Sequence, residues 1–128
     1  MWIDSLDSNE VFVYGANEAG RHGAGAAKQA MQWGAKYGEY GLNGHTYGIP
    51  TKDRDLQVLP LIDIYAHVVD FLSCARRNPR FTFLVTEIGC GLAGYKVDDI
   101  APMFAVVPDN VVLNESFRNF LNKQHEQV

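Results

Sequence analysis

The sequence predicts an α/β fold with a mostly parallel sheet of about four strands and helices on both faces. Two observations lead to this expectation. Short apolar runs rich in β-branched and aromatic residues alternate with longer segments whose apolar residues recur every three or four positions. A loop of unusual composition, rich in glycine or polar residues, follows each of the first three runs. The 128 residues and the 47% hydrophobic content suit a single domain over residues 1–128.

Each expected strand is a short apolar run with a recognisable end. The first closes at Gly15, the second ends before Pro50, and the third reads F-T-F-L-V-T. The glycines at 38, 41 and 44 indicate a loop before the second strand. The strands are expected at 11–15, 46–49, 81–86 and 111–113.

Each expected strand is followed by a segment with a helical pattern. The second helix is the clearest, because Pro60 suits a first helical turn and Asn78-Pro79 ends the pattern. Pro102 falls in the first turn of the third helix, where a missing N–H matters little. The helices are expected at 25–36, 60–77, 98–107 and 115–125.

Composition and charge limit the environment and the partners. No apolar run reaches membrane-spanning length, and the N-terminus, M-W-I-D, lacks the basic and apolar regions of a signal peptide. Cys74 and Cys90 form no C-x-x-C pair, so we expect a reduced, cytoplasmic protein. The net charge of −4 argues against broad, non-specific nucleic-acid binding but leaves room for a local basic groove. We expect neither a metal site nor a cofactor, since the histidines lack metal-ligand spacing: His22, His45, His67 and His125.

The most informative stretch is residues 17–27, N-E-A-G-R-H-G-A-G-A-A. It lies between an apolar run and an alanine-rich helical segment, which is a layout that binds phosphates through backbone N–H groups. It is neither the Rossmann pattern G-x-G-x-x-G nor a P-loop, because no Gly-Lys-Ser/Thr follows. Phosphate binding and a merely tight strand-to-helix turn are both open at this point.

Three loops follow strands and are expected to meet. They are residues 17–25, 51–53 and 89–95, the last reading G-C-G-L-A-G-Y. Ligands of open parallel sheets bind at the carboxyl ends of the strands, where the strand order reverses. The convergence of two glycine loops and one polar loop on that edge predicts a binding site.

Three motifs together resemble those of the macrodomain family. Residues 17–27 resemble its first ligand loop, in the branch where this loop reads N-x-x-G-x-x-G-x-G. Residues 47–52, Y-G-I-P-T-K, resemble that branch's P-T-K segment, and residues 88–92, I-G-C-G-L, resemble its second loop. The branch includes hydrolases that remove ADP-ribose from protein carboxylates and antitoxins that remove it from DNA. The resemblance extends over residues 11–106.

The resemblance implies a three-layer α/β/α macrodomain-like fold with the strands in the order fourth, third, first, second. It also implies an ADP-ribose cleft between the two glycine loops. There, Asn17 hydrogen-bonds the distal ribose, and Gly20, Gly23 and Gly25 form a wall. The second loop holds the diphosphate through backbone N–H groups of Gly89, Cys90, Gly91, Leu92, Ala93, Gly94 and Tyr95.

By the same resemblance, Lys52 attacks or orients the anomeric carbon of the distal ribose. A lysine nucleophile must be neutral, and the positive ends of nearby helices favour that state. The alternative is an ordinary solvated lysine. Some hydrolases of the branch carry an aspartate where this chain has Ala93, and neither Asp4 nor Asp7 follows a glycine as the family's adenine-reading aspartate does.

Other site residues also have structural alternatives. Asn17 suits a turn cap, and Tyr95 suits either packing on the sheet or stacking on a ligand ring. Cys90 suits a tight loop as a small residue, and a nucleophilic role for it requires His22 as the base.

Two functions from different classes remain. One is an ADP-ribosyl hydrolase that uses Lys52 and acts on ADP-ribosylated protein or nucleic acid. The other is a non-catalytic module that binds or sequesters ADP-ribose or a related NAD-derived nucleotide. A third interpretation is a hydrolase of another phosphorylated nucleotide in the same cleft.

Overall fold

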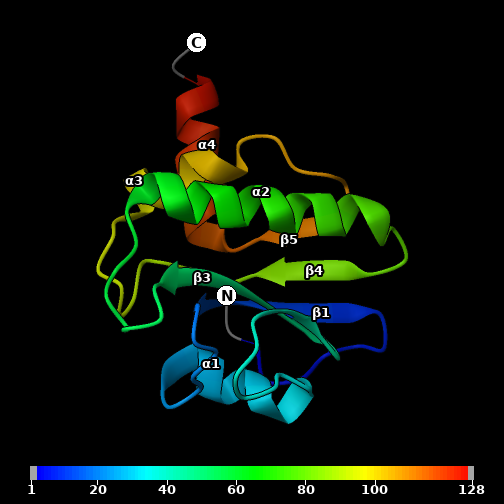
Figure 1. Ribbon diagram of the computed structural model, residues 1–128. Coiled ribbons are helices and arrows are strands. Elements are labelled where there is room, and N and C mark those ends of the chain that lie inside the picture. Colours follow the sequence, from blue (N-terminus) through cyan, green and yellow to red (C-terminus); the bar gives the residue numbers. More distant parts are fainter. Residues whose placement is uncertain (1–2, 127–128) are drawn as a thin grey trace.

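A mixed sheet of five strands forms the centre of the computed structural model, which describes residues 3–126 (Figure 1). The strand order is β2-β3-β1-β4-β5, with β1, β3, β4 and β5 parallel and β2 antiparallel to β3. The four expected strands therefore lie in the predicted order of fourth, third, first, second. Met1 and Trp2 belong to the N-terminal stretch that lacks the features of a signal peptide, and they lie outside the described residues. The strands are β1 (Glu10–Asn17), β2 (Gly41–Asn43), β3 (Thr46–Lys52), β4 (Thr82–Val85) and β5 (Val111–Leu113).

The prediction was wrong at two places in the sheet. Residues 41–43, expected in a loop, form the short edge strand β2, which pairs with β3 from Gly41↔Gly48 to Asn43↔Thr46. The strand β3 also continues through Pro50 to Lys52. Pro50 lies past the last residue that pairs with β2, so its missing N–H breaks no bond between these two strands.

Two of the expected helices are shorter than predicted. The first stops because Gly34 adopts a left-handed conformation with φ 110°, which ends the helical turn. The third changes to a 3₁₀ helix next to Pro102, which has no N–H to continue the α-helical bonds. The long second helix and the last helix are confirmed. The helices are α1 (Gly25–Ala30), η1 (Met31–Trp33), α2 (Leu61–Arg77), α3 (Val97–Ile100), η2 (Ala101–Phe104) and α4 (Glu115–Glu126).

The alternating side chains of β1 divide the core between the two faces of the sheet. Val11 and Val13 pack on one face, in a cluster that includes residues of α2, η2 and α4. Phe12, Tyr14 and Ala16 pack on the other, with alanines of α1. Figure 1 shows α2 and α1 on opposite sides of the sheet, so helices cover both faces as predicted. Within residues 3–126, no helix combines the length and the apolar character needed to cross a bilayer.

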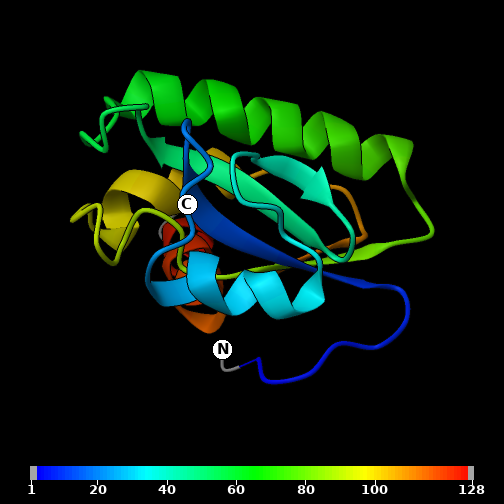
Figure 2. The same cartoon turned by 60° about the horizontal axis from the view of Figure 1, so that its bottom comes forward.

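The strand order of the sheet reverses beside β1. From β1 the chain continues through α1 to β2 and β3, which lie between β1 and one edge of the sheet. The strands β4 and β5 lie between β1 and the other edge (Figure 2). The strand order thus reverses between β1 and β4. The loop that leaves β1 leads to a helix on one face of the sheet, and the loop that leaves β4 leads to helices on the other face. Such a reversal is where ligands bind in open α/β sheets.

Candidate functional site

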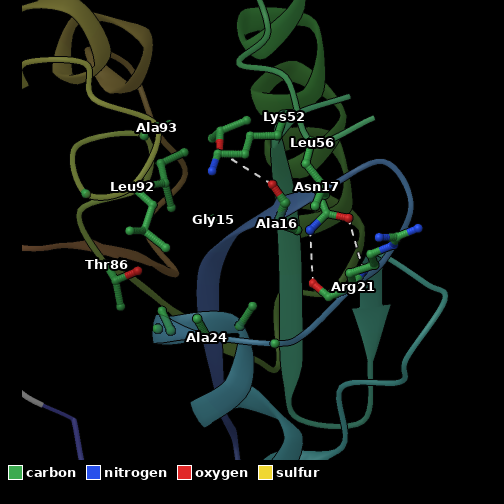
Figure 3. A pocket seen from close by; sticks show the side chains of 18 of the residues that line it. Gly15, Ala16, Asn17, Arg21, Ala24, Lys52, Leu56, Thr86, Leu92 and Ala93 are labelled. Carbon is green, nitrogen blue, oxygen red and sulfur yellow. Dashed lines mark hydrogen bonds between the residues drawn. The ribbon is translucent and has the colours of Figure 1, made fainter. Parts of the chain in front are cut away.

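A cavity of about 480 Å³ lies at the carboxyl ends of β1, β3 and β4 (Figure 3). Gly15 and Ala16 of β1 lie at its centre in this view, between the two glycine loops. The first glycine loop is residues 17–25 and the second is residues 89–95. Both contribute to the lining together with Lys52 of β3, so the predicted convergence of the three loops is confirmed.

Most of the residues predicted for the site line this cavity. Among them are Lys52, Asn17, Gly23, Gly25, Gly89, Gly91, Leu92 and Ala93. Four predicted ligand contacts do not: Gly20, Cys90, Gly94 and Tyr95. Asp4 and Asp7, considered for adenine recognition, are exposed and also lie outside the lining.

Asn17 fixes the shape of the first glycine loop. Its Oδ1 accepts a hydrogen bond from the backbone N–H of Arg21 at 3.0 Å, and its Nδ2 donates to the Arg21 carbonyl at 2.9 Å. Both bonds are drawn in Figure 3, where the Arg21 guanidinium points away from the centre of the cavity. Asn17 therefore acts as a cap of the turn, the structural alternative considered for it, while it also lines the cavity.

Gly20 has a packing role. It has φ 69°, and a Cβ at this position would overlap the backbone of Gly38 and Glu39, which crosses directly against the loop. The N–H of Gly38 donates to the Gly20 carbonyl at 2.8 Å, which fastens the two segments together. Gly20 is therefore required for close backbone packing. Gly23 differs, because a Cβ there would meet nothing within 4 Å.

His22 anchors the same loop to the sheet. The Nε2 atom of its buried ring lies 2.9 Å from the hydroxyl oxygen of Tyr14, within hydrogen-bond distance. A Cβ at Gly48 would lie 2.8 Å from that hydroxyl oxygen, so the neighbouring strand must carry glycine there. Within residues 3–126 the Nδ1 atom of His22 has no hydrogen-bond partner.

The structure argues against Cys90 as a nucleophile with His22 as its base. Cys90 does not line the cavity, and His22 is engaged with Tyr14. Burial, followed by the charges of Glu87 and Asp99, raises the pKa of the Cys90 thiol to about 11. A neutral thiol is a poor nucleophile, so Cys90 is better understood as a small residue in a tight loop.

The second glycine loop divides its backbone N–H groups between the protein and the cavity. The N–H groups of Cys90, Gly94 and Tyr95 donate to carbonyls of Glu87, Gly91 and Gly89. Over the described part of the chain, no acceptor is found for the N–H groups of Gly89, Gly91, Leu92 and Ala93, and these four residues line the cavity. In this loop, the residues that line the cavity are those whose N–H groups have no acceptor in the described chain.

Two further residues explain why the second glycine loop keeps its shape. Gly89 has φ 75°, and a Cβ there would lie 3.0 Å from Cδ1 of Ile100, so the position needs glycine on both grounds. The Tyr95 hydroxyl donates to the Leu59 carbonyl at 2.6 Å, and its ring packs on the main core cluster. Of the two possibilities for Tyr95, the structure shows the packed one.

The unpaired N–H groups have counterparts in the first glycine loop. Gly23, Ala24 and Gly25 line the cavity, and their N–H groups have no acceptor among residues 3–126. A Leu92 methyl carbon from the opposite loop lies 3.9 Å from the place a Gly25 Cβ would occupy. The two loops therefore approach one another, and residues with unpaired N–H groups line one cavity from both loops.

Lys52 lies at the end of β3 beside the first glycine loop. It is partly buried and lines the cavity, and its carbonyl accepts the N–H of Glu18 at 2.9 Å. The described residues form one salt bridge, between His67 and Glu18, and Lys52 takes no part in it. Its ammonium group is thus available to a ligand.

Sequence reasoning missed several lining residues. Glu87 is the one carboxylate among the described lining residues, and its Oε1 accepts a hydrogen bond from Ser116 Oγ at 2.7 Å. Its position directly after the third expected strand is a signal that could have indicated it. Tyr37 and Leu56 also line the cavity, but they lie in segments that carry no motif. Asp53, by contrast, caps its own turn and does not line the cavity.

Comparisons with known proteins add no assignment. No protein-family model, no curated protein and no solved structure matches this chain. Among residues 3–126, no group of three or more histidine, cysteine, aspartate or glutamate side chains is placed to hold a metal ion.

Proposed function

We propose that this protein binds ADP-ribose or a related NAD-derived nucleotide in the cavity between its two glycine loops. The observation that carries the proposal is the set of unpaired backbone N–H groups on both sides of the cavity, at Gly23, Ala24 and Gly25 and at Gly89, Gly91, Leu92 and Ala93. Backbone N–H groups in glycine-rich loops bind phosphate oxygens without side-chain bulk. Two such sets around one space suit a diphosphate.

The size and setting of the cavity support a nucleotide over a smaller anion. A volume of about 480 Å³ lies within the 300–1,000 Å³ that is usual for small-molecule sites. The resemblance of the three motifs to the macrodomain family supports the same choice. It also extends to the fold, for which we propose a macrodomain-like α/β/α arrangement with an additional antiparallel edge strand, β2.

The position of Lys52 in the cavity favours a second, catalytic function. Its amine is free of protein carboxylates in the described chain and lies in the cavity near the first glycine loop. In a bound ADP-ribose conjugate, that loop would hold the distal ribose, so Lys52 would attack or orient its anomeric carbon. Glu87 is the carboxylate placed to assist release, since it is the one carboxylate among the described residues that line the cavity.

The test of binding is titration calorimetry with ADP-ribose, NAD and AMP. We expect the parent protein to bind ADP-ribose with a dissociation constant of about 1 mM or lower. Gly91→Glu adds a negative side chain to the second glycine loop and should weaken binding more than about tenfold by steric and charge repulsion. Gly91→Ala is the matched control, because a Cβ at Gly91 meets nothing within 4 Å.

Thermal unfolding shows whether both variants keep the fold. Loss of binding in Gly91→Glu, with retention in Gly91→Ala, supports the diphosphate position. A folded Gly91→Glu protein that binds as well as the parent excludes it. Absence of binding to all three nucleotides by the parent protein would refute the proposal.

A further inference from the structure

Leu56 has a backbone conformation that is costly for its residue type. Its φ is 62°, and it is the one non-glycine residue with positive φ in residues 3–126. Leucine lacks the polar side chain that lets asparagine or aspartate adopt this conformation more easily. Strained residues persist only where the surrounding structure enforces them, and they concentrate at ligand sites.

The loop around Leu56 is built to enforce this conformation. The Oδ1 atom of Asp53 accepts the N–H groups of Asp55 at 2.8 Å and Gln57 at 3.0 Å. The N–H of Leu56 donates to the Asp53 carbonyl at 3.1 Å, and Lys52 pairs with Val58 across the base of the loop. The turn is therefore closed by its own hydrogen bonds, and these bonds hold the backbone of Leu56 in its positive-φ conformation.

Packing inside the protein does not account for a leucine here. The Leu56 side chain is 39% exposed and belongs to neither core cluster, yet it lines the cavity. Leu92 from the second glycine loop is 77% exposed and lines the same cavity. Figure 3 shows these two leucines on opposite sides of the space, with Lys52 near Leu56.

We infer that Leu56 and Leu92 form an apolar clamp for a ring of the bound nucleotide. The inference rests on the proposed function and specifies it: the ligand carries a sugar or base ring with two apolar faces, in addition to its phosphates. The two leucines contact opposite faces of that ring, and the free N–H groups of the two glycine loops take the phosphates. A ligand without a ring, such as inorganic pyrophosphate, gains nothing from the clamp.

The first test compares affinity and stability in Leu56 variants, with ADP-ribose as the probe. Leu56→Gly removes both the strain and the side chain, so the Tm should stay level or rise while ADP-ribose affinity falls about tenfold. Leu56→Asn removes the apolar side chain without adding the flexibility of glycine, since asparagine tolerates positive φ. Its affinity for ADP-ribose should also fall about tenfold. Leu56→Met keeps an apolar chain and should retain affinity within about threefold. Leu42→Ala is the surface control, because Leu42 is equally exposed at 39% and lies outside the cavity.

The second test observes the contact directly. In the complex of parent protein and ADP-ribose, nuclear Overhauser effects should connect methyl protons of Leu56 and Leu92 with ring protons of the ligand. Unchanged ADP-ribose affinity in Leu56→Gly and Leu56→Asn, or the absence of these effects, overturns the clamp while the proposed function stands. If the parent protein does not bind ADP-ribose at all, the proposed function itself fails, and the clamp with it.

Discussion

The side-chain amide of Asn17 hydrogen-bonds both backbone groups of Arg21, accepting from its N–H and donating to its carbonyl. These two hydrogen bonds close the first half of the first glycine loop. The residues that follow, Gly23 to Gly25, line the cavity. The resemblance to macrodomains implies a ribose contact for the same asparagine. The two roles are compatible, because Asn17 also lines the cavity and its amide retains one N–H and one lone pair.

Asn17→Ala should loosen the loop, lower ligand affinity and cost at most about 2 kcal/mol of stability. Each lost hydrogen bond is net worth about 1 kcal/mol, and the Arg21 backbone groups regain water because this residue is exposed. ADP-ribose affinity, measured by calorimetry, should fall about tenfold or more. Arg21→Ala is the matched control, since both bonds go to the backbone of Arg21. An equal loss of affinity in Arg21→Ala would contradict a role for the closed turn alone and assign part of the binding to the Arg21 side chain, since Arg21 also lines the cavity.

Gly20 and Gly23 should respond in opposite ways to alanine, although both lie in the first glycine loop. A Cβ at Gly20 overlaps the backbone of Gly38 and Glu39 and also forces positive φ on alanine, so Gly20→Ala should lose about 3 kcal/mol of stability. A Cβ at Gly23 meets nothing within 4 Å, and Gly23→Ala should leave the Tm within about 2 °C of the parent. Thermal unfolding measures the Tm of both variants, and urea denaturation measures their free energies of unfolding. Similar stabilities would show that the Gly38–Glu39 segment moves away easily.

Cys90 should make the protein less stable in alkali. Its thiol has a pKa of about 11 in the folded state against an ordinary value of 9.0. Between these values the unfolded chain releases the thiol proton while the folded protein retains it, so this contribution to stability is unchanged below pH 9 and is lost as pH rises towards 11.

Urea denaturation at intervals from pH 8 to pH 11 measures this effect. Tyr14, whose pKa burial raises to about 12, contributes in an overlapping range, so the parent curve contains more than one group. The Cys90→Ala variant should therefore lose less stability between pH 9 and pH 11 than the parent does. Parallel curves for the two proteins would show that Cys90 does not titrate with a raised pKa.

The strands of the sheet could be predicted where the sequence carries a local signal. The apolar runs and their glycine or proline ends indicate β1, β3, β4 and β5. The edge strand β2 reads Gly41-Leu42-Asn43 and has one apolar residue, so nothing local distinguishes it from a loop. Its formation depends on pairing with β3, a non-local partner.

The candidate site divides in the same way. The two glycine loops and Lys52 follow strands directly, and the parallel sheet brings such positions together. Gly20 lies outside the lining predicted for it, because a glycine required by backbone packing has the same sequence signature as one required by a ligand. Tyr37 and Leu56 reach the cavity through tertiary packing and turn geometry, which no spacing of residues reveals.

Catalysis by Lys52 is the prediction that separates a hydrolase from a binding module. An amine attacks an anomeric carbon as a neutral nucleophile. The glycine loops would hold the diphosphate and orient the distal ribose, which is catalysis by positioning. When Lys52 Nζ bonds to the anomeric carbon, the bond from that carbon to the acceptor breaks and the acceptor leaves with the bonding electrons. Glu87 would then take a proton from the water that cleaves the new N–C bond and return it to the lysine amine.

Lys52→Ala should reduce release of ADP-ribose at least about 100-fold, while affinity for free ADP-ribose changes less than about fivefold because the phosphate contacts come from the backbone. Lys52→Arg should be equally inactive, since arginine stays protonated. Glu87→Gln should slow turnover and leave binding intact. The assay follows release from ADP-ribosylated protein and ADP-ribosylated DNA in parallel. Full activity in Lys52→Ala would point to a water molecule as the nucleophile, and no release from either substrate by the parent protein would favour a non-catalytic module.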